Sequence, residues 1–167
     1  MKKIITFSIV LLAFTAASFA QGPLVSANAT ATAVIVSPLT ITQTANMSFG
    51  NIIADADGGT VVLVPAGTRT LNGLTSPAIT GTVTAASFTV AGAAGLAYTI
   101  TLPTDHTISS GGNNMLIDTF TSNPSGTGTL VGGTETLTVG ATLNVGANQA
   151  AGTYTNATGF TVSVNYN

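Results

Sequence analysis

Strict alternation of apolar and polar residues near the C-terminus is the feature that most narrows what this chain can fold into. Phe160, Val162, Val164 and Tyr166 alternate with polar neighbours, and this period of two residues places the four side chains on one face of a β-strand. A longer run with the same period covers residues 137–145. No segment after residue 20 has the 3.6-residue period of an amphipathic helix. The pattern therefore predicts an all-β fold.

Shorter apolar runs, separated by Gly, Pro and Asn, predict the remaining strands. We expect strands over residues 29–36, 39–42, 47–53, 60–64 and 115–120, and two more in which Phe88 with Val90, and Tyr98 with Ile100 and Leu102, alternate inward. The runs around Phe88 and Tyr98 are expected to form a hairpin, and the 137–145 run is expected to pair with the closing strand. Residues 69–81, 104–114 and 123–133 are expected to be loops. Seven to nine strands joined in this way predict an antiparallel β-sandwich.

The first twenty residues have the organisation of a secretory signal peptide. A basic start, Met1-Lys2-Lys3, precedes an apolar run and the small residues that end at Ala20, which is the order expected of such a signal. The apolar run is shorter than the roughly 20 residues that cross a membrane as a helix. We therefore expect cleavage after Ala20, a short leader over residues 21–28 and a single domain over residues 29–167. The product would be periplasmic, on the cell surface or extracellular.

The exported part has few charged residues and no cysteine. Arg69 is its only basic residue against five acidic ones, a net charge of −4, and the chain has no Cys. Nucleic-acid binding is excluded because it needs a basic surface. Charged residues make up 5% of the chain, against about 25% in an average domain, so little charge repulsion opposes association between copies. The composition indicates a protein that assembles or lies in a matrix.

Candidate catalytic and metal-binding residues are few. His106 is the only His and follows Asp105 in an expected loop, but no Gly-x-Ser-x-Gly nucleophile motif is present. Asp55 and Asp57, followed by Gly58, resemble the start of a calcium loop without its remaining acidic ligands. A turn is the main expectation there, and a weak cation site is the alternative. The sequence predicts no enzyme activity and no catalytic, cofactor or metal site.

Three stretches carry a resemblance to a known family: residues 47–52, residues 85–92, and Gly152-Thr153-Tyr154 with the closing strand. There the chain resembles the secreted bacterial family called domain of unknown function 4402, over almost the whole exported part. The opening Phe49-Gly50 and the closing Gly152-Thr153-Tyr154 with the strand that ends at Tyr166 are also similar to spore coat protein U and to subunits of chaperone-usher pili. That similarity implies an immunoglobulin-like or pilin-like sandwich that a strand from a neighbour completes. The chain departs from many such pilins in having no disulfide.

Residues 29–36 distinguish two modes of assembly. Pro38 separates this alternating run from the rest of the chain. In a self-complete domain the run is the first strand, which the short leader favours; otherwise it occupies a groove in a neighbouring copy, with Ala31, Ala33 and Ile35 setting the register. The predicted function is an exported structural or adhesive subunit of a surface fibre or matrix. A monomeric binding module for a surface glycan or protein is the alternative.

Overall fold

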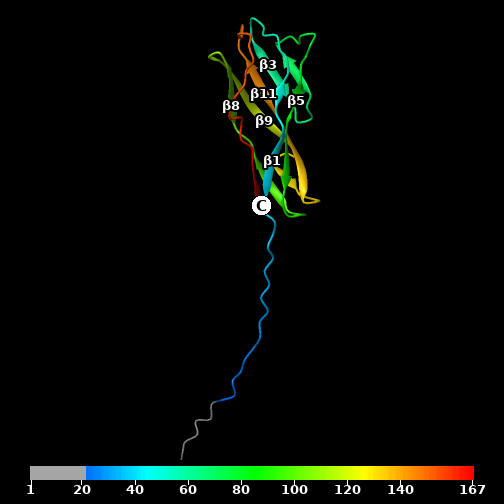
Figure 1. Cartoon of the computed structure of the whole chain (residues 1–167), viewed down its shortest axis with the longest axis vertical. Helices are drawn as coiled ribbons and strands as arrows, with labels where there is room; N and C mark the ends of the chain where they lie inside the picture. Colours follow the sequence, from blue (N-terminus) through cyan, green and yellow to red (C-terminus); the bar gives the residue numbers. More distant parts are fainter. Residues whose placement is uncertain (1–21) are drawn as a thin grey trace, which may run out of the picture. The chain divides into compact units, whose positions relative to one another are not determined.

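The computed structural model describes residues 22–167, and the predicted signal peptide lies outside them. The part of the chain from residue 22 onward forms twelve β-strands, most of them antiparallel, and the prediction of an all-β sandwich is confirmed (Figure 1). Among these residues there is no helix with the length and apolar character to cross a membrane. A short N-terminal unit ends at Val34, and the β domain begins at Ile35.

Strand β11 (Thr134–Val145) is the centre of the larger sheet. Its first half pairs with β6 (Ala86–Ala91) and its second half with β3 (Gly59–Leu63), while β9 (Asn113–Asn123) pairs along its other side. Each of these neighbours carries one further strand: β1 (Thr40–Ala45) beside β6, β4 (Arg69–Asn72) beside β3, and β8 (Asp105–Ser110) beside β9.

The alternation read in residues 137–145 puts one face of β11 in the core. Five residues on that face are buried: Leu137, Val139, Ala141, Leu143 and Val145. The predicted strand is therefore confirmed, and it is the longest of the twelve strands.

Two short sheets cover the inner face of the large one. In the first, β7 (Ala97–Thr101) lies between β10 (Thr127–Thr129) and β12 (Ser163–Tyr166). The second is only β2 (Ser48–Phe49) paired with β5 (Val83–Thr84). The second layer of the sandwich is thus much less complete over the end of the domain that β2 and β5 cover.

The core divides accordingly into two clusters. Cluster A packs the first half of β11 and β6 against the β7 sheet, with the residues Ala86, Val90, Tyr98, Ile100, Leu130, Leu137, Val139 and Val162. Cluster B packs the second half of β11, β3 and β9 against Phe49 of β2, with the residues Val61, Leu63, Ile117, Ala141, Leu143 and Val145. Several partly buried side chains surround cluster B, among them Ile52, Ile108 and Met115.

The closing strand has the predicted face but a different partner. From residue 160 to 166 burial alternates as expected, with Val162 buried and its polar neighbours exposed. β12 pairs with β7 and not with β11, because β6, β3 and β9 already occupy both sides of β11. Phe160 precedes β12 and is only half-buried. Removing its side chain should therefore cost less than the roughly 3–5 kcal/mol of removing a fully buried Phe.

Residues 29–36 form no strand within the chain, so the prediction that they are its first strand is wrong. Val34 and Ile35 are 84% and 98% exposed. The reason lies in the register: Thr40, the first residue of β1, stands opposite Ala91, the last residue of β6. Residues before Thr40 have no neighbouring strand to pair with.

Other differences concern segments expected to be loops. β4, β8 and β10 all lie in such segments, which raises the number of strands above the predicted seven to nine. The runs around Phe88 and Tyr98 do form strands, but β6 and β7 belong to different sheets. The Gly-rich turn at residues 92–95 therefore carries the chain from one layer to the other and does not close a hairpin.

A buried tyrosine and a carboxylate stabilise cluster A. Tyr98 has no exposed surface, and its hydroxyl donates a hydrogen bond to Glu135 Oε2 at 2.9 Å. The backbone N–H of Thr129 donates to the same oxygen at 2.9 Å. Burial, the hydrogen bond and the negative charge of Glu135 raise the pKa of Tyr98 well above its ordinary value, so the folded protein holds this proton where an unfolded chain would lose it.

The stability of the protein is expected to fall as the pH rises above about 10, the ordinary pKa of tyrosine. Above that pH, Tyr98 loses its proton in the unfolded chain but keeps it in the folded protein. Ionisation therefore stabilises the unfolded state relative to the folded state. Urea unfolding between about pH 8 and pH 11 measures this, and Tyr98→Phe should reduce the dependence. An identical pH profile for Tyr98→Phe and the parent protein would contradict the assignment.

Candidate functional site

An open groove runs over cluster B where the second layer is incomplete. Its volume is about 1040 Å³, just above the range of roughly 300–1,000 Å³ that small-molecule pockets occupy. The floor is the inner face of β8, β9 and β11, with His106, Ile108, Met115, Ile117, Leu143 and Val145. Ile108 and Met115, directly opposite each other in the β8–β9 pair, remain partly exposed in it. The groove thus presents apolar core surface to solvent.

The first wall of the groove is residues 46–54. On the side away from the groove, this wall is hydrogen-bonded to residues 75–82. The bonds include Asn51 N to Thr80 O at 2.7 Å and Ile53 N to Thr75 O at 3.0 Å. The C=O of Ile53 also accepts from Thr75 N. Because successive residues of an extended chain direct their backbone groups to opposite sides, those of Ile52 and Ala54 face the groove. Within residues 22–167 these groups have no backbone hydrogen-bond partner.

Gly50 allows this wall to pass close to its neighbours. Its φ is +72°, and a Cβ atom there would lie 2.5 Å from the carbonyl oxygen of Thr80. Arg69, the one basic side chain among the described residues, donates to the Phe49 carbonyl on the same wall, so its charge supports the wall and not the groove surface.

The second wall is formed by residues 149–156 with Gly159 and Phe160. Thr155 pairs with Ser109 at the outer edge of β8, with N···O distances of 3.0 and 3.1 Å. The amide of Asn156 donates to the Thr107 carbonyl at 2.9 Å. Gln149 donates to the Tyr154 hydroxyl, which donates in turn to the Ala150 carbonyl. These contacts attach a segment without regular structure to the edge strand and keep the groove open between the two walls.

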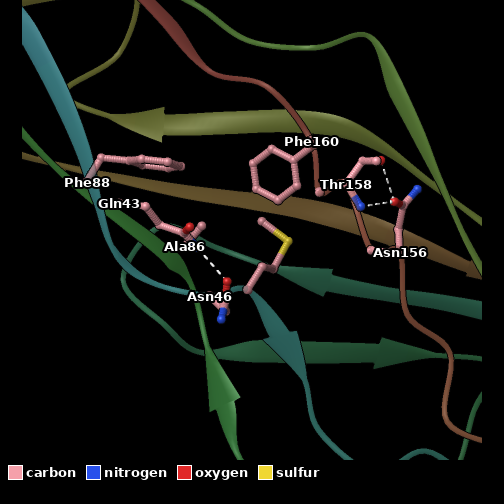
Figure 2. Close-up of a pocket in the computed structure, with 10 residues that line it drawn as sticks. Gln43, Asn46, Ala86, Phe88, Asn156, Thr158 and Phe160 are labelled. Carbon is pink, nitrogen blue, oxygen red and sulfur yellow. Dashed lines mark hydrogen bonds between the residues drawn. The ribbon is translucent and has the colours of Figure 1, made fainter.

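A smaller pocket of about 240 Å³ adjoins the groove and shares Asn46, Met47 and Phe160 with it. Figure 2 shows the rings of Phe88 and Phe160 at this pocket with the side chains of Gln43 and Asn156. The Gln43 amide donates to the side-chain oxygen of Asn46. The hydroxyl and the backbone N–H of Thr158 donate to Asn156 Oδ1 at 2.7 and 2.8 Å. The amide groups beside the aromatic rings make this end of the groove more polar than the floor over cluster B.

The structure separates the two residues considered for catalysis. His106 and Asp105 are adjacent on β8, so their side chains point to opposite faces of the sheet. Asp105 is exposed, whereas His106 is half-buried in the groove floor, with its ring edge-on to Phe160 at 6.0 Å. The prediction of an exposed loop His was wrong because residues 105–110 form a strand. His106 Nε2 is buried and has no hydrogen-bond partner in the described residues.

Asp55 and Asp57 lie in the predicted turn. Gly58 N donates to the Asp55 carbonyl at 3.2 Å, and Asn148 N donates to the same oxygen at 2.9 Å. The Asp55 carboxylate accepts from Ala56 N. Both aspartates are exposed, and residues 22–167 contain no group of three or more His, Asp or Glu side chains placed to hold a metal ion.

The position of the groove and the residues that form it are what sequence reasoning missed. Its floor and walls come from five separate parts of the chain, and residues 149–159 have no periodicity.

A family model described as a domain of unknown function (DUF4402) matches residues 39–166. The chain belongs to the DUF4402 family. No curated protein and no solved structure matches it. The DUF4402 match covers both walls and the floor of the groove, and it begins after residues 22–38.

Proposed function

We propose that this DUF4402 protein is an exported, non-enzymatic structural or adhesive subunit that associates with other copies to form a surface fibre or an extracellular matrix. The groove is the observation that carries the proposal. It leaves Ile52, Ile108 and Met115 partly exposed over cluster B, and contiguous exposed apolar surface of this kind marks interaction sites in folded proteins. No carboxylate lines it. Its chemistry suits burial of an apolar partner.

The scarcity of charge supports association between copies. The chain carries 5% charged residues, so long-range repulsion between copies is small. Threonine and other neutral polar residues occupy the outer positions of most strands, which keeps the surface hydrated without a strong electric field. Contacts formed under these conditions depend on apolar burial and backbone hydrogen bonds more than on ion pairs.

A monomeric module that binds a surface glycan is the second candidate. The observation in its favour is the smaller pocket, where Phe88 and Phe160 lie beside the amides of Gln43 and Asn156. Aromatic faces with neighbouring amides are suited to the apolar faces and hydroxyls of a neutral sugar. That pocket is about 240 Å³, which is small for more than one sugar unit by the usual size of ligand pockets, about 300–1,000 Å³.

The purified exported chain, residues 21–167, is expected to self-associate as its concentration rises. Size-exclusion chromatography with light scattering measures the mass, and electron microscopy shows whether the products are fibres. Raising the salt concentration should not dissolve them, because screening weakens charge contacts and leaves apolar burial intact. A protein that stays monomeric at every concentration contradicts the proposal. Chemical-shift changes at Phe88 and Asn156 upon adding neutral oligosaccharides to that monomer would favour the second candidate.

A further inference from the structure

The groove gathers every imidazole and every thioether group of the exported chain. His106 is the only histidine in the sequence, and Met47 and Met115 are the only methionines after residue 20. All three line the groove, although its lining is a small part of the described residues. Each of the three side chains is half-buried, so none of them is sealed in the core. The groove is therefore the one place in the exported chain where these soft donor groups occur together.

The register of the β8–β9 hairpin makes His106 and Met115 diagonal neighbours on the groove floor. His106 stands opposite Ile117, and Met115 stands opposite Ile108. Alternate residues of a strand share a face, so the two side chains rise from the same side of the hairpin. Diagonal neighbours in an antiparallel pair are about 7–8 Å apart and within reach of each other through long side chains. The imidazole and the thioether can thus approach a common point above the floor.

The imidazole has a nitrogen atom that the protein leaves without a partner. His106 Nε2 is buried and has no hydrogen bond to any described residue, whereas most buried polar side-chain atoms in proteins have one. The ring that lies beside it is Phe160, with the centroids 6.0 Å apart, and Phe160 packs in turn against Phe120 at 5.0 Å. Neither ring offers a hydrogen-bond acceptor of ordinary strength. With the proton on Nδ1, Nε2 carries a lone pair that is available to a metal ion.

Met47 brings the second thioether from the first wall of the groove. It directly precedes β2 and packs against both cluster A and cluster B. It also lines the end of the groove that Phe160 lines, and Phe160 is the ring in contact with His106. A methionine side chain is unbranched and has three rotatable bonds, so its sulfur is able to adjust to a ligand. Met47 therefore stands at the same end of the groove as the unpaired imidazole.

We propose that His106, Met47 and Met115 bind a soft monovalent metal ion, Cu⁺, for which Ag⁺ is a redox-inert probe. Thioether sulfur selects Cu⁺ among biological metal ions, and imidazole also suits copper. Three neutral ligands leave a single positive charge to be removed from water, which costs less than the burial of a divalent ion. The inference goes beyond the proposed function and does not depend on it, because one copy supplies all three ligands.

The chemistry of the groove disfavours the commoner metal ions. Ca²⁺ and Mg²⁺ are bound mainly through carboxylate and other oxygen ligands, and no Asp or Glu of the described residues lines the groove. Zn²⁺ sites use sets of three or four Cys, His and carboxylate ligands. His106 is the only one of these ligands in the groove. Selectivity for Cu⁺ and Ag⁺ over Zn²⁺ and Ca²⁺ is thus part of the proposal.

Titration of the exported chain, residues 21–167, with Cu⁺ tests the site. Under oxygen-free conditions and in competition with a chromophoric Cu⁺ chelator, the protein should take up one Cu⁺ per chain. Calorimetry should give the same stoichiometry for Ag⁺ and no binding of Zn²⁺ or Ca²⁺. X-ray absorption of the copper-loaded protein should show sulfur neighbours at about 2.3 Å and nitrogen at about 2.0 Å, as these ligands have in zinc sites. No uptake of Cu⁺, or nitrogen and oxygen neighbours alone, overturns the proposal.

Substitutions of the ligands distinguish metal binding from packing. Met47→Leu and Met115→Leu nearly conserve volume, so both should keep the circular-dichroism spectrum. Each should weaken Cu⁺ binding by at least the roughly 10–100-fold that loss of an outer-shell partner costs, and His106→Phe should weaken it at least as much. Ile108→Leu is the matched control, since Ile108 lies on the same floor opposite Met115 but has no ligand atom. Equal Cu⁺ affinities of the parent and the folded methionine variants show a packing role alone and overturn the proposal.

Methyl resonances of the two methionines locate the ion directly. The exported chain labelled with ¹³C-methyl methionine should give two signals, from Met47 and Met115. Both should shift upon addition of one equivalent of Ag⁺ to a dilute sample, and neither should shift at that concentration in His106→Phe. A shift of one methyl only, or shifts that persist in His106→Phe, overturn the three-ligand site. Because the sample is dilute, the result is the same whether or not the protein assembles at high concentration, so a failure here leaves the proposed function standing.

Discussion

Replacing Leu143 by alanine is expected to lower the free energy of unfolding by about 2–5 kcal/mol, the usual cost of a cavity at a buried leucine. Leu143 is 1% exposed and stands in register with Val61 on β3 and Ile117 on β9. It is thus enclosed by both neighbouring strands of the large sheet and by Phe49 in cluster B. Neighbours held in three strands cannot collapse into the space that the side chain leaves.

Leu116→Ala is the matched control for this substitution. Leu116 lies on β9 beside Ile117 and opposite Asn144, but it points to the outer face and is 42% exposed. Its removal should change stability by no more than about 0.5 kcal/mol. Urea unfolding followed by circular dichroism measures both variants, since the chain has no Trp for fluorescence. Similar losses for the two variants would show that cluster B is not a packed core.

Period-2 alternation predicted the faces of the long strands but not their partners. The burial of Val162 and of alternate residues in β11 follows from local pattern alone. Pairing depends on residues distant in the sequence: β12 joins β7 across more than sixty positions. Nothing in the strand itself distinguishes β7 from β11 as a partner, because both offer alternating apolar residues.

The β8–β9 hairpin shows a signal that the sequence contained and that the loop prediction missed. Ser110 pairs with Asn113, so Gly111 and Gly112 form a two-residue turn. Their φ angles are +55° and +87°, the left-handed values that such hairpin turns require and that Gly supplies readily. A Gly-Gly pair between His106-x-Ile108 and Met115-x-Ile117 predicts this hairpin, and with it most of the groove floor.

The groove could not have been predicted from the same patterns. Its opening depends on where the second layer ends, and β2 and β5 have only two residues each. The wall at residues 149–156 is held by side-chain bonds such as Asn156 to Thr107, which have no periodicity. Sequence alternation did predict residues 29–36 as a strand, and the structure assigns no strand to them.

Gly140→Ala is expected to destabilise the protein by about 3 kcal/mol, the upper end of the usual cost of overpacking. Gly140 lies where β11 changes its partner from β6 to β3. A Cβ atom there would be 2.1 Å from the Leu63 carbonyl oxygen and 2.7 Å from the Val64 carbonyl carbon. Both are backbone atoms that cannot rotate aside, so β3 must separate from β11 at the strand end that supports cluster B.

Gly132→Ala provides the control for Gly140→Ala because it makes the same chemical change without the contact. A Cβ atom at Gly132 would meet no atom within 4 Å, and its backbone is outside the left-handed region, so we expect a change within about 0.5 kcal/mol. Urea unfolding compares the two variants. Since Leu63 and Leu143 belong to cluster B beneath the groove, Gly140→Ala should also weaken self-association at temperatures where it remains folded. Equal stabilities of the two variants would show that β11 and β3 are not held as closely as this geometry requires.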